Sequence, residues 1–278
     1  MISRLTGALL RALIVVLMIS TPSLLLGDTS IDGAQIIILV AIFAAMLTIF
    51  EYASTYPGLV EFRDAPPFNR VRFFSLFITV FLLSIICKGE TAPSAATELV
   101  RAIGALVGHA IDFPYSPVRL VVLMLPEDAT VDQINLLRAT AGLSYLISLV
   151  TLATFIIILR VRGWPLRSGA FNVWVNLPTF DPTAGGDVVT RLERDARVNI
   201  ALGFLLPFVV PAIIDAAGTL TSSVSLDNYH TLIWTVAAWA FLPASLFLRG
   251  IAMGRIAKMI TAKRRESSAA EQGDLLPA

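Results

Sequence analysis

The sequence predicts an all-α integral membrane protein, built as a bundle of about six membrane-spanning helices. Of its 278 residues, 56% are hydrophobic and only 15% are charged, whereas a soluble domain has about 45–50% and about 25%. The apolar residues gather in six runs that approach the roughly 20 residues that a spanning helix needs. The alternating ten-residue segments typical of a membrane β-barrel are absent from the sequence.

The six predicted spans lie at 8–26, 34–50, 71–86, 139–159, 200–217 and 231–248. Their polar side chains are mostly Ser and Thr, which bond to their own helix backbone or to a neighbouring helix and are therefore tolerated in hydrocarbon. We expect residues 1–260 to form a single membrane domain. A basic juxtamembrane helix should continue to Arg265, and the chain becomes small and polar from Glu266. We expect a flexible cytoplasmic tail over residues 261–278.

The first span has the basic start of a signal peptide, because Arg4 and Arg11 precede its apolar run. The run resumes at Leu24, however, and no clear small-x-small cleavage site follows. We therefore expect an uncleaved anchor helix. Cleavage stays an alternative, and it would leave the orientation of the other five spans unchanged.

The positions of Lys and Arg predict the orientation of the bundle. All of them except Lys88, Arg101, Arg119 and Arg138 fall at the N-terminus, in the second and fourth connections, or after the last span. Basic residues resist translocation, so both termini should be cytoplasmic, which fits a bacterial cytoplasmic (inner) membrane. Basic residues beside inner span ends also predict contact with anionic lipid, and no nucleic-acid partner is expected.

The long outer connection, 89–138, should contain an extracytoplasmic surface helix. Ser94 can cap this helix, and its apolar residues share one face: Leu99, Ile103, Leu106, Val107 and Ala110. The apolar residues 120–125 are too few to span, so they form a re-entrant, interfacial or packed segment. Thr130 and Gln133 have capping-box spacing and should open a helix that continues into the fourth span.

The inner connection, 160–199, has two parts. Hydrophobic and other residues alternate from Phe171 to Leu177, which indicates a strand or hairpin arm that ends at Pro178. Further on, Asp187 can cap a helix that leads into the fifth span.

The fifth span carries the strongest candidate for an intramembrane ion or proton site. Gly203, Pro207, Pro211 and Asp215 recur every four residues and so stay on one broad helix face. Each proline frees the carbonyl four residues earlier. Freed carbonyls and a carboxylate are suited to hold a cation or pass a proton. The alternative is structural, since Asp215 lies near the outer end of the span, where it reaches headgroup water.

The segment from Glu51 to Arg72 mixes charged, aromatic and Pro residues more densely than any other part of the chain. We expect Glu51 to anchor the second span at the interface. The segment itself should form a structured elbow rather than a loose linker. Four of its charged residues are candidates for a docking face, although a packed turn would have the same composition: Glu61, Arg63, Asp64 and Arg70.

Other metal, cofactor and packing signals are weak. His109 and His230 each have an aspartate three residues away, Asp112 and Asp227, but these segments are distant in sequence. Cys87 is the only cysteine, which excludes an internal disulfide and a Cys-based zinc site. We expect no cofactor and no metal. Gly250 and Gly254 allow a close helix contact within the chain.

These observations favour a non-enzymatic accessory or assembly component of a membrane complex, in contact with the lipid bilayer and with membrane protein partners. No nucleophile, acid cluster or Walker motif identifies a reaction, so an enzyme is disfavoured. One alternative is a small transporter or channel subunit that uses the fifth-span face. A second alternative is a membrane-embedded lipid-modifying enzyme.

Overall fold

The computed structural model describes residues 2–27, 30–165, 171–181, 183, 185–218 and 228–274. These residues form nine helices and no strand: α1 (Ile2–Leu26), α2 (Ile31–Ala53), α3 (Phe68–Thr91), α4 (Ala95–Ile111), α5 (Pro117–Val122), α6 (Val131–Arg162), α7 (Val173–Asn176), α8 (Val188–Gly218) and α9 (Tyr229–Asp274). Six of them are long and apolar enough to cross a membrane: α1, α2, α3, α6, α8 and α9. The predicted multi-pass helical membrane protein is confirmed.

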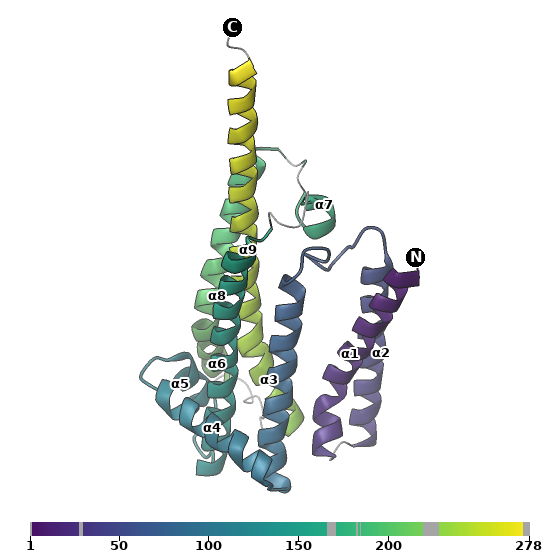
Figure 1. The fold of residues 1–278 in the computed structure, drawn as a ribbon. Coiled ribbons are helices and arrows are strands. Elements are labelled where there is room, and N and C mark those ends of the chain that lie inside the picture. The colour runs from purple at the N-terminus through teal and green to yellow at the C-terminus, as the bar shows by residue number, and fades with distance from the viewer. Residues whose placement is uncertain are drawn as a thin grey trace.

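Consecutive spans run in alternate directions, and both chain ends lie at the same end of the bundle (Figure 1). We call this the terminal end, and we call the opposite end, where α4 and α5 lie, the far end. Helices α8 and α9 lie side by side, and α3 and α6 pack against α9. The α1–α2 hairpin is attached through α1, which packs on α3, while α2 packs mainly against α1.

Small polar side chains join the spans inside the bundle. The Ser148 hydroxyl of α6 donates to the Ala240 carbonyl of α9 over 2.9 Å. The Thr151 hydroxyl of α6 donates to the Ser75 hydroxyl of α3, also over 2.9 Å. Hydrogen bonds of this kind contribute to helix association in hydrocarbon, where burying apolar surface gives little.

The predicted helix starts in the long connections are confirmed. The Ser94 hydroxyl accepts from the Thr97 N–H at the start of α4. Thr130 and Gln133 form a reciprocal capping box, and α6 then runs unbroken into its span. The Thr190 N–H donates to the Asp187 carboxylate over 3.1 Å at the start of α8. These starts depend only on nearby residues, which is why the sequence alone predicts them.

Glycines set a very close crossing between α4 and α6 at the far end. A Cβ on Gly108 would lie 2.6 Å from the Arg138 carbonyl oxygen, and one on Gly142 would overlap the Gly108 Cα. The short α5 buries Val118 and Val121 against the bundle. Of the three alternatives for residues 120–125, the packed segment agrees with this burial.

One local prediction was wrong. The alternating stretch from Phe171 to Leu177 contains the single helical turn α7 instead of a strand. Backbone N–H groups of Asn176 and Leu177 donate four residues back, and the Asn172 side chain accepts from the Val175 N–H. Asn172 thus caps the turn, and a period of two over seven residues does not exclude helix.

The described part of residues 261–278 is helical, because α9 continues to Asp274. Lys, Arg, Glu, Gln and Ala dominate this stretch, and all of them favour helix even when exposed. At 1.5 Å per residue, its 46 residues extend about 69 Å, more than twice the roughly 30 Å hydrocarbon core. The helix therefore projects well beyond the terminal end.

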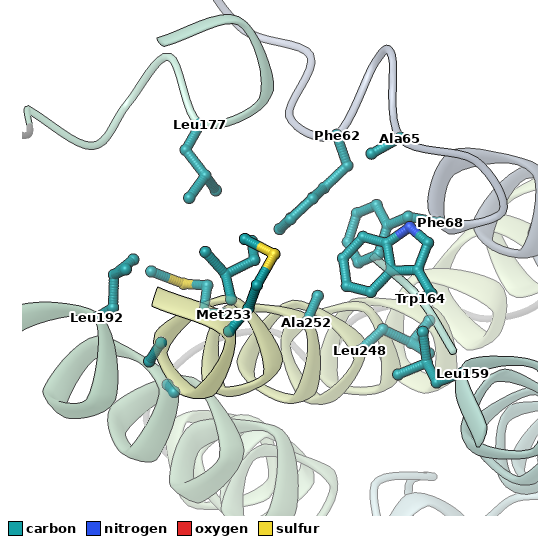
Figure 2. Close-up of a cluster of buried hydrophobic side chains, with 14 of the residues drawn as sticks. Phe62, Ala65, Phe68, Leu159, Trp164, Leu177, Leu192, Leu248, Ala252 and Met253 are labelled. Carbon is teal, nitrogen blue, oxygen red and sulfur yellow. The ribbon is translucent and has the colours of Figure 1, made fainter. Parts of the chain in front are cut away.

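A hydrophobic core closes the bundle at the terminal end, beyond the middle of the spans. It gathers Phe62 and Ala65 from the elbow, Leu177 from the α7 segment and Met253 from α9. Figure 2 shows Phe62 and Leu177 directed toward α9, with Trp164 beside Phe68. Core packing of this kind fixes loops that would otherwise move. The terminal end is therefore rigid. We call this core and the loops that it holds the cap.

Candidate functional site

The carboxylate of Glu51 organises the elbow between α2 and α3. It accepts hydrogen bonds from the N–H groups of Gly58, Leu59 and Val60, at 2.9–3.2 Å. Glu51 is only 2% exposed. Successive backbone N–H groups form a concave anion site, here filled by the chain's own carboxylate. The predicted interface anchor is therefore a buried one that folds the elbow back onto the end of α2.

Arg63 completes this anchor from the other side. Its guanidinium donates to the backbone carbonyls of Glu51 (2.9 Å) and Ser54 (2.7 Å). These carbonyls lie at the C-terminal end of α2, where the helix provides no further N–H donors and a positive charge is favourable. The Arg63 side chain is 6% exposed. Arg63 therefore holds the α1–α2 hairpin in a fixed position relative to the elbow.

Glu61 ties the elbow to α9. Its carboxylate receives both donors of the Arg249 fork, at 2.6 and 2.8 Å, and also the Thr179 hydroxyl. Its backbone carbonyl accepts from the Asn69 amide over 2.7 Å. A two-bond pair between Arg and a carboxylate is among the stronger polar contacts in proteins. Glu61 thus links three segments that are far apart in sequence.

The α7 segment docks on the elbow through one asparagine. The Asn176 backbone carbonyl accepts from the Phe62 N–H over 2.6 Å, and its side-chain oxygen accepts from the Asp64 N–H over 3.1 Å. Phe62 itself has φ 53°, an uncommon value for a non-glycine residue. The Asn176 contact and the burial of the Phe62 ring hold this conformation in place.

The four predicted elbow residues therefore divide into two pairs. Glu61 and Arg63 are used inside the protein, as in the packed-turn alternative. Asp64 has a side chain that is 57% exposed, and Arg70 is exposed at the start of α3. Only these two remain accessible to a partner.

A cavity of about 750 Å³ opens beneath the elbow, between the α2–α3 side of the molecule and the α8–α9 pair. Its polar lining lies toward the cap: Tyr52, Glu61, Asn69, Arg72, Ser245 and Arg249. The rest of the lining is apolar and includes Phe73, Leu206 and Phe241. We call this space the lateral pocket. Its size and mixed lining are typical of a small-molecule site.

Arg72 is the unusual residue of the lateral pocket. Its guanidinium carbon lies 5.2 Å from the Phe68 ring centroid and 5.9 Å from that of Phe241. Its Nε is fully buried and has no hydrogen-bond partner among the described residues. Within that same part of the chain, no carboxylate forms an ion pair with Arg72. A guanidinium in this environment is suited to bind an anion.

A second, smaller cavity of about 250 Å³ lies nearer the far end. Its lining is almost wholly apolar and includes Val121, Val210, Trp239 and Pro243. Leu206 and Leu242 line both this cavity and the lateral pocket. The two spaces are therefore neighbours along the α8–α9 groove.

The candidate ion-site residues of α8 face two environments. Gly203, Pro207 and Pro211 are buried, and Gly203 lies against the backbone of Pro243 and Phe247 in α9. The Pro207 carbonyl, which Pro211 leaves free, accepts from the Trp239 indole N–H over 3.1 Å. Asp215 is exposed. A drift of about 40° per four residues turns it away from the other three, so these contacts favour the packing alternative.

The far end has its own charged cluster. The Asp112 carboxylate, 4% exposed, pairs with Arg119 through one oxygen and with Arg138 through the other, each at 2.7 Å. These three residues join the end of α4 to α5 and α6. The cluster gives a structural role to two of the four basic residues that depart from the general charge pattern, Arg119 and Arg138.

The structure does not bring the histidines into a metal site. His109 is exposed, and its Nδ1 lies 2.8 Å from the Ala105 carbonyl. Asp227 lies outside the described residues, and among those described no group of three metal-binding side chains gathers. Cys87 is buried. Gly250 packs against Ala196 of α8, so the expected close helix contact is internal.

One ion pair connects the start of α8 with the long α9. Arg264 donates to Asp187 over 2.6 Å, and the Thr190 N–H donates to the same carboxylate. The Arg264 hydrogen bond, and after it the Thr190 N–H, hold the pKa of Asp187 below its usual value. The pair fixes α9 beyond the membrane.

The sequence analysis missed the lateral pocket and the partners of Glu51, Glu61 and Asp112. Arg72 left only a weak signal, because it lies one residue inside a predicted span, and arginines near span ends commonly extend to the interface. The partners of the three carboxylates left no signal in the sequence. Glu61 and Arg249, for example, are 188 positions apart, so no local pattern connects them.

With this geometry in hand, comparison with known proteins adds no relative: no family model, no curated protein and no solved structure matches the chain.

Proposed function

We propose that this protein is a non-enzymatic, multi-pass component of a membrane complex, which binds a spanning helix of a partner protein through α2. One observation carries the proposal. Five large apolar residues of α2 follow a 3-4-3-4 spacing, the repeat of helices that pack side by side, and each is 58–69% exposed: Ile36, Leu39, Phe43, Met46 and Phe50. We call this row the α2 stripe.

The rest of α2 supports the same function. Of its 23 residues only Ala41 and Glu51 are buried, so the helix contributes little to its own bundle. Nevertheless Glu51 and Arg63 hold its end in place through six hydrogen bonds. A helix that is firmly positioned but packs mainly on one neighbour is suited to present a face to another protein. The exposed Asp64 and Arg70, in the elbow that follows α2, are accessible to the same partner.

The proposed setting is the cytoplasmic membrane of a bacterium, with the cap in the cytoplasm. Most basic residues lie at the terminal end, as the positive-inside rule requires. In this orientation α4 lies at the outer surface. Its Leu99, Ile103 and Leu106 are exposed on the side opposite the Gly104 and Gly108 contact with α6. That apolar face would rest on lipid, as in an interfacial helix.

The partner is tested by crosslinking from the α2 stripe. A photoreactive residue is placed at Phe43, 65% exposed, and as a matched control at Phe204 of α8, 60% exposed. After irradiation in the native membrane, mild extraction and native mass measurement follow. We expect a stoichiometric crosslink to one other membrane protein from position 43 and none from position 204.

Substitutions then decide whether the stripe itself binds. The double change Leu39→Ala and Phe43→Ala should release the partner, while Phe204→Ala should retain it. Equal crosslinking from both positions, or a crosslinked mass of two copies of this chain, would contradict the proposal. Labelling of cysteines introduced at Arg70 and Tyr115 tests the orientation, because only the second should react from outside intact cells.

A further inference from the structure

The lining of the lateral pocket carries one positive charge in excess. Arg72, Arg249 and Glu61 are its charged residues. Glu61 and Arg249 form a two-bond pair with each other. Arg72 is partly exposed, its guanidinium lies over two aromatic rings, and its buried Nε has no hydrogen-bond partner among the described residues. A partly desolvated charge that forms no ion pair is stabilised when an anionic ligand binds it.

The position of Arg72 along α3 indicates how deep in the membrane such a ligand would lie. Arg72 is the fifth residue of α3, which starts at Phe68, so it lies about 6 Å along the helix from the elbow. Tyr52, one residue before the end of α2, and Arg249 of α9 line the same pocket. Polar groups at span ends, with apolar groups deeper, reproduce the layering of one membrane leaflet.

The apolar lining is suited to the hydrocarbon part of an anionic amphiphile. Beyond Arg72 the pocket walls include Phe73, Leu76 and Leu246, and Leu206 and Leu242 continue to the second cavity. A small soluble anion would satisfy Arg72 and leave these walls facing water. An amphiphile would cover both parts. The single net charge matches a phosphodiester, which carries one negative charge, better than a phosphomonoester, which carries nearly two.

We propose that the lateral pocket binds one anionic phospholipid of the membrane, with its phosphodiester on Arg72 and the first part of its acyl chains along Leu76, Leu206 and Leu242. Two features distinguish this site from ordinary contact with surrounding lipid. The guanidinium is fixed by Phe68 and Phe241, and it presents a planar set of donors that matches phosphate oxygens. Basic pockets between spans on the cytoplasmic side are suited to such headgroups.

The test measures lipid retention by the full chain. Purified protein is equilibrated with equal amounts of phosphatidylglycerol and phosphatidylcholine of the same chain length, and bound lipids are counted by native mass spectrometry. We expect one phosphatidylglycerol per chain, preferred about tenfold or more, because the same phosphodiester in phosphatidylcholine carries its own cation, which repels the charge of Arg72. Arg72→Gln should abolish the preference, and Arg72→Lys should keep part of it.

Arg70 provides the matched control, because it lies two residues away on the same helix and is exposed outside the pocket lining. Arg70→Gln should leave the preference unchanged. Leu246→Trp, which keeps every charge but fills the apolar part, should reduce retention. This variant also keeps the test decisive if Arg72→Gln fails to fold.

Three results with the lipid pair would overturn the proposal, and a fourth comes from competition with phosphate. The three are equal retention of both lipids by the unaltered protein, equal losses in the Arg70 and Arg72 variants, and full retention in Leu246→Trp. Competition by millimolar inorganic phosphate against the lipid would also overturn it, since that would indicate an anion site that does not use the apolar walls.

Discussion

The guanidinium of Arg63 donates to the backbone carbonyl of Glu51, whose own carboxylate accepts three backbone N–H groups from the elbow. One residue at the end of α2 is therefore held through its main chain and its side chain at once. This arrangement explains how a hairpin that packs on the bundle mainly through α1 can still be fixed in position.

Glu51→Gln should loosen the elbow. The neutral amide keeps the size of the side chain but loses the charge that three N–H groups surround. Replacing this acceptor should lower stability by about 1.5–3 kcal/mol. Asp32→Asn, at the exposed other end of α2, is the control and should change little. Thermal unfolding in detergent, followed by tryptophan fluorescence, measures both; equal effects would show that Glu51 has no special role.

Glu61 and Arg249 should be strongly coupled in a double-mutant cycle. Their two hydrogen bonds lie in a partly buried setting, with side-chain exposures of 11% and 26%. We expect a coupling free energy of about 1–3 kcal/mol from the variants Glu61→Gln, Arg249→Gln and the double variant. The same cycle for Asp195 and Arg194, an exposed pair of neighbours, should give about 0–1 kcal/mol. Similar values for the two pairs would contradict the prediction.

The helix crossing at the far end should tolerate no side chain at Gly108. Gly108→Ala would place a Cβ 2.6 Å from the Arg138 carbonyl oxygen, whereas Gly104→Ala would place one 3.2 Å from the Ala139 carbonyl oxygen. The first change should destabilise by about 1–3 kcal/mol, as overpacking does, and should open α4 to proteolysis. The second should have a much smaller effect. Equal protease resistance of the two variants would contradict the crossing geometry.

Acid should loosen the contact between the start of α8 and α9. The folded protein holds the pKa of Asp187 low through Arg264 and Thr190. A depressed folded-state pKa means that this stabilisation is complete above the usual carboxyl pKa, about 4, and is lost as the pH falls through the lower folded value. Hydrogen-exchange protection at the Thr190 amide measures it. In Asp187→Asn the protection should no longer change over that pH range.

Asp215→Asn should leave both partner crosslinking and assembly intact. Asp215 is exposed and turned away from the buried Pro207, whose carbonyl already has a donor in Trp239. Trp239→Phe, which removes that donor inside the bundle, should instead lower thermal stability. A protein with Asp215→Asn that still assembles but has lost its cellular function would restore the transport alternative.

The parts of the fold that sequence predicted are those that nearby residues determine. The spans follow from runs of apolar residues, and the caps at Ser94, Thr130 and Asp187 each need only a residue three positions away. The α7 turn was misread because seven alternating residues fit either a strand or a single helical turn. Small and polar composition alone did not predict that α9 continues to Asp274, where Lys, Arg, Glu, Gln and Ala favour helix.

The candidate site was harder to predict, because it depends on distant partners. Among the elbow residues, composition indicated a structured segment but did not distinguish the paired Glu61 and Arg63 from the exposed Asp64 and Arg70. On α8, the four-residue spacing places Gly203, Pro207 and Pro211 on one buried face, whereas the drift leaves Asp215 exposed. The structure then showed Trp239 at the Pro207 carbonyl, and no spacing rule predicts a donor 32 positions away.

The length of α9 carries its end far into water. The rigid cap, which includes Met253, and the bond from Arg264 to Asp187 hold the helix outside the spans. From Arg264 to Asp274 the helix extends a further ~15 Å, so a tilt of about 10° at that bond would displace its end by about 3 Å. Because Asp187 lies at the start of α8, the position of that end depends on how α8 and α9 pack against each other.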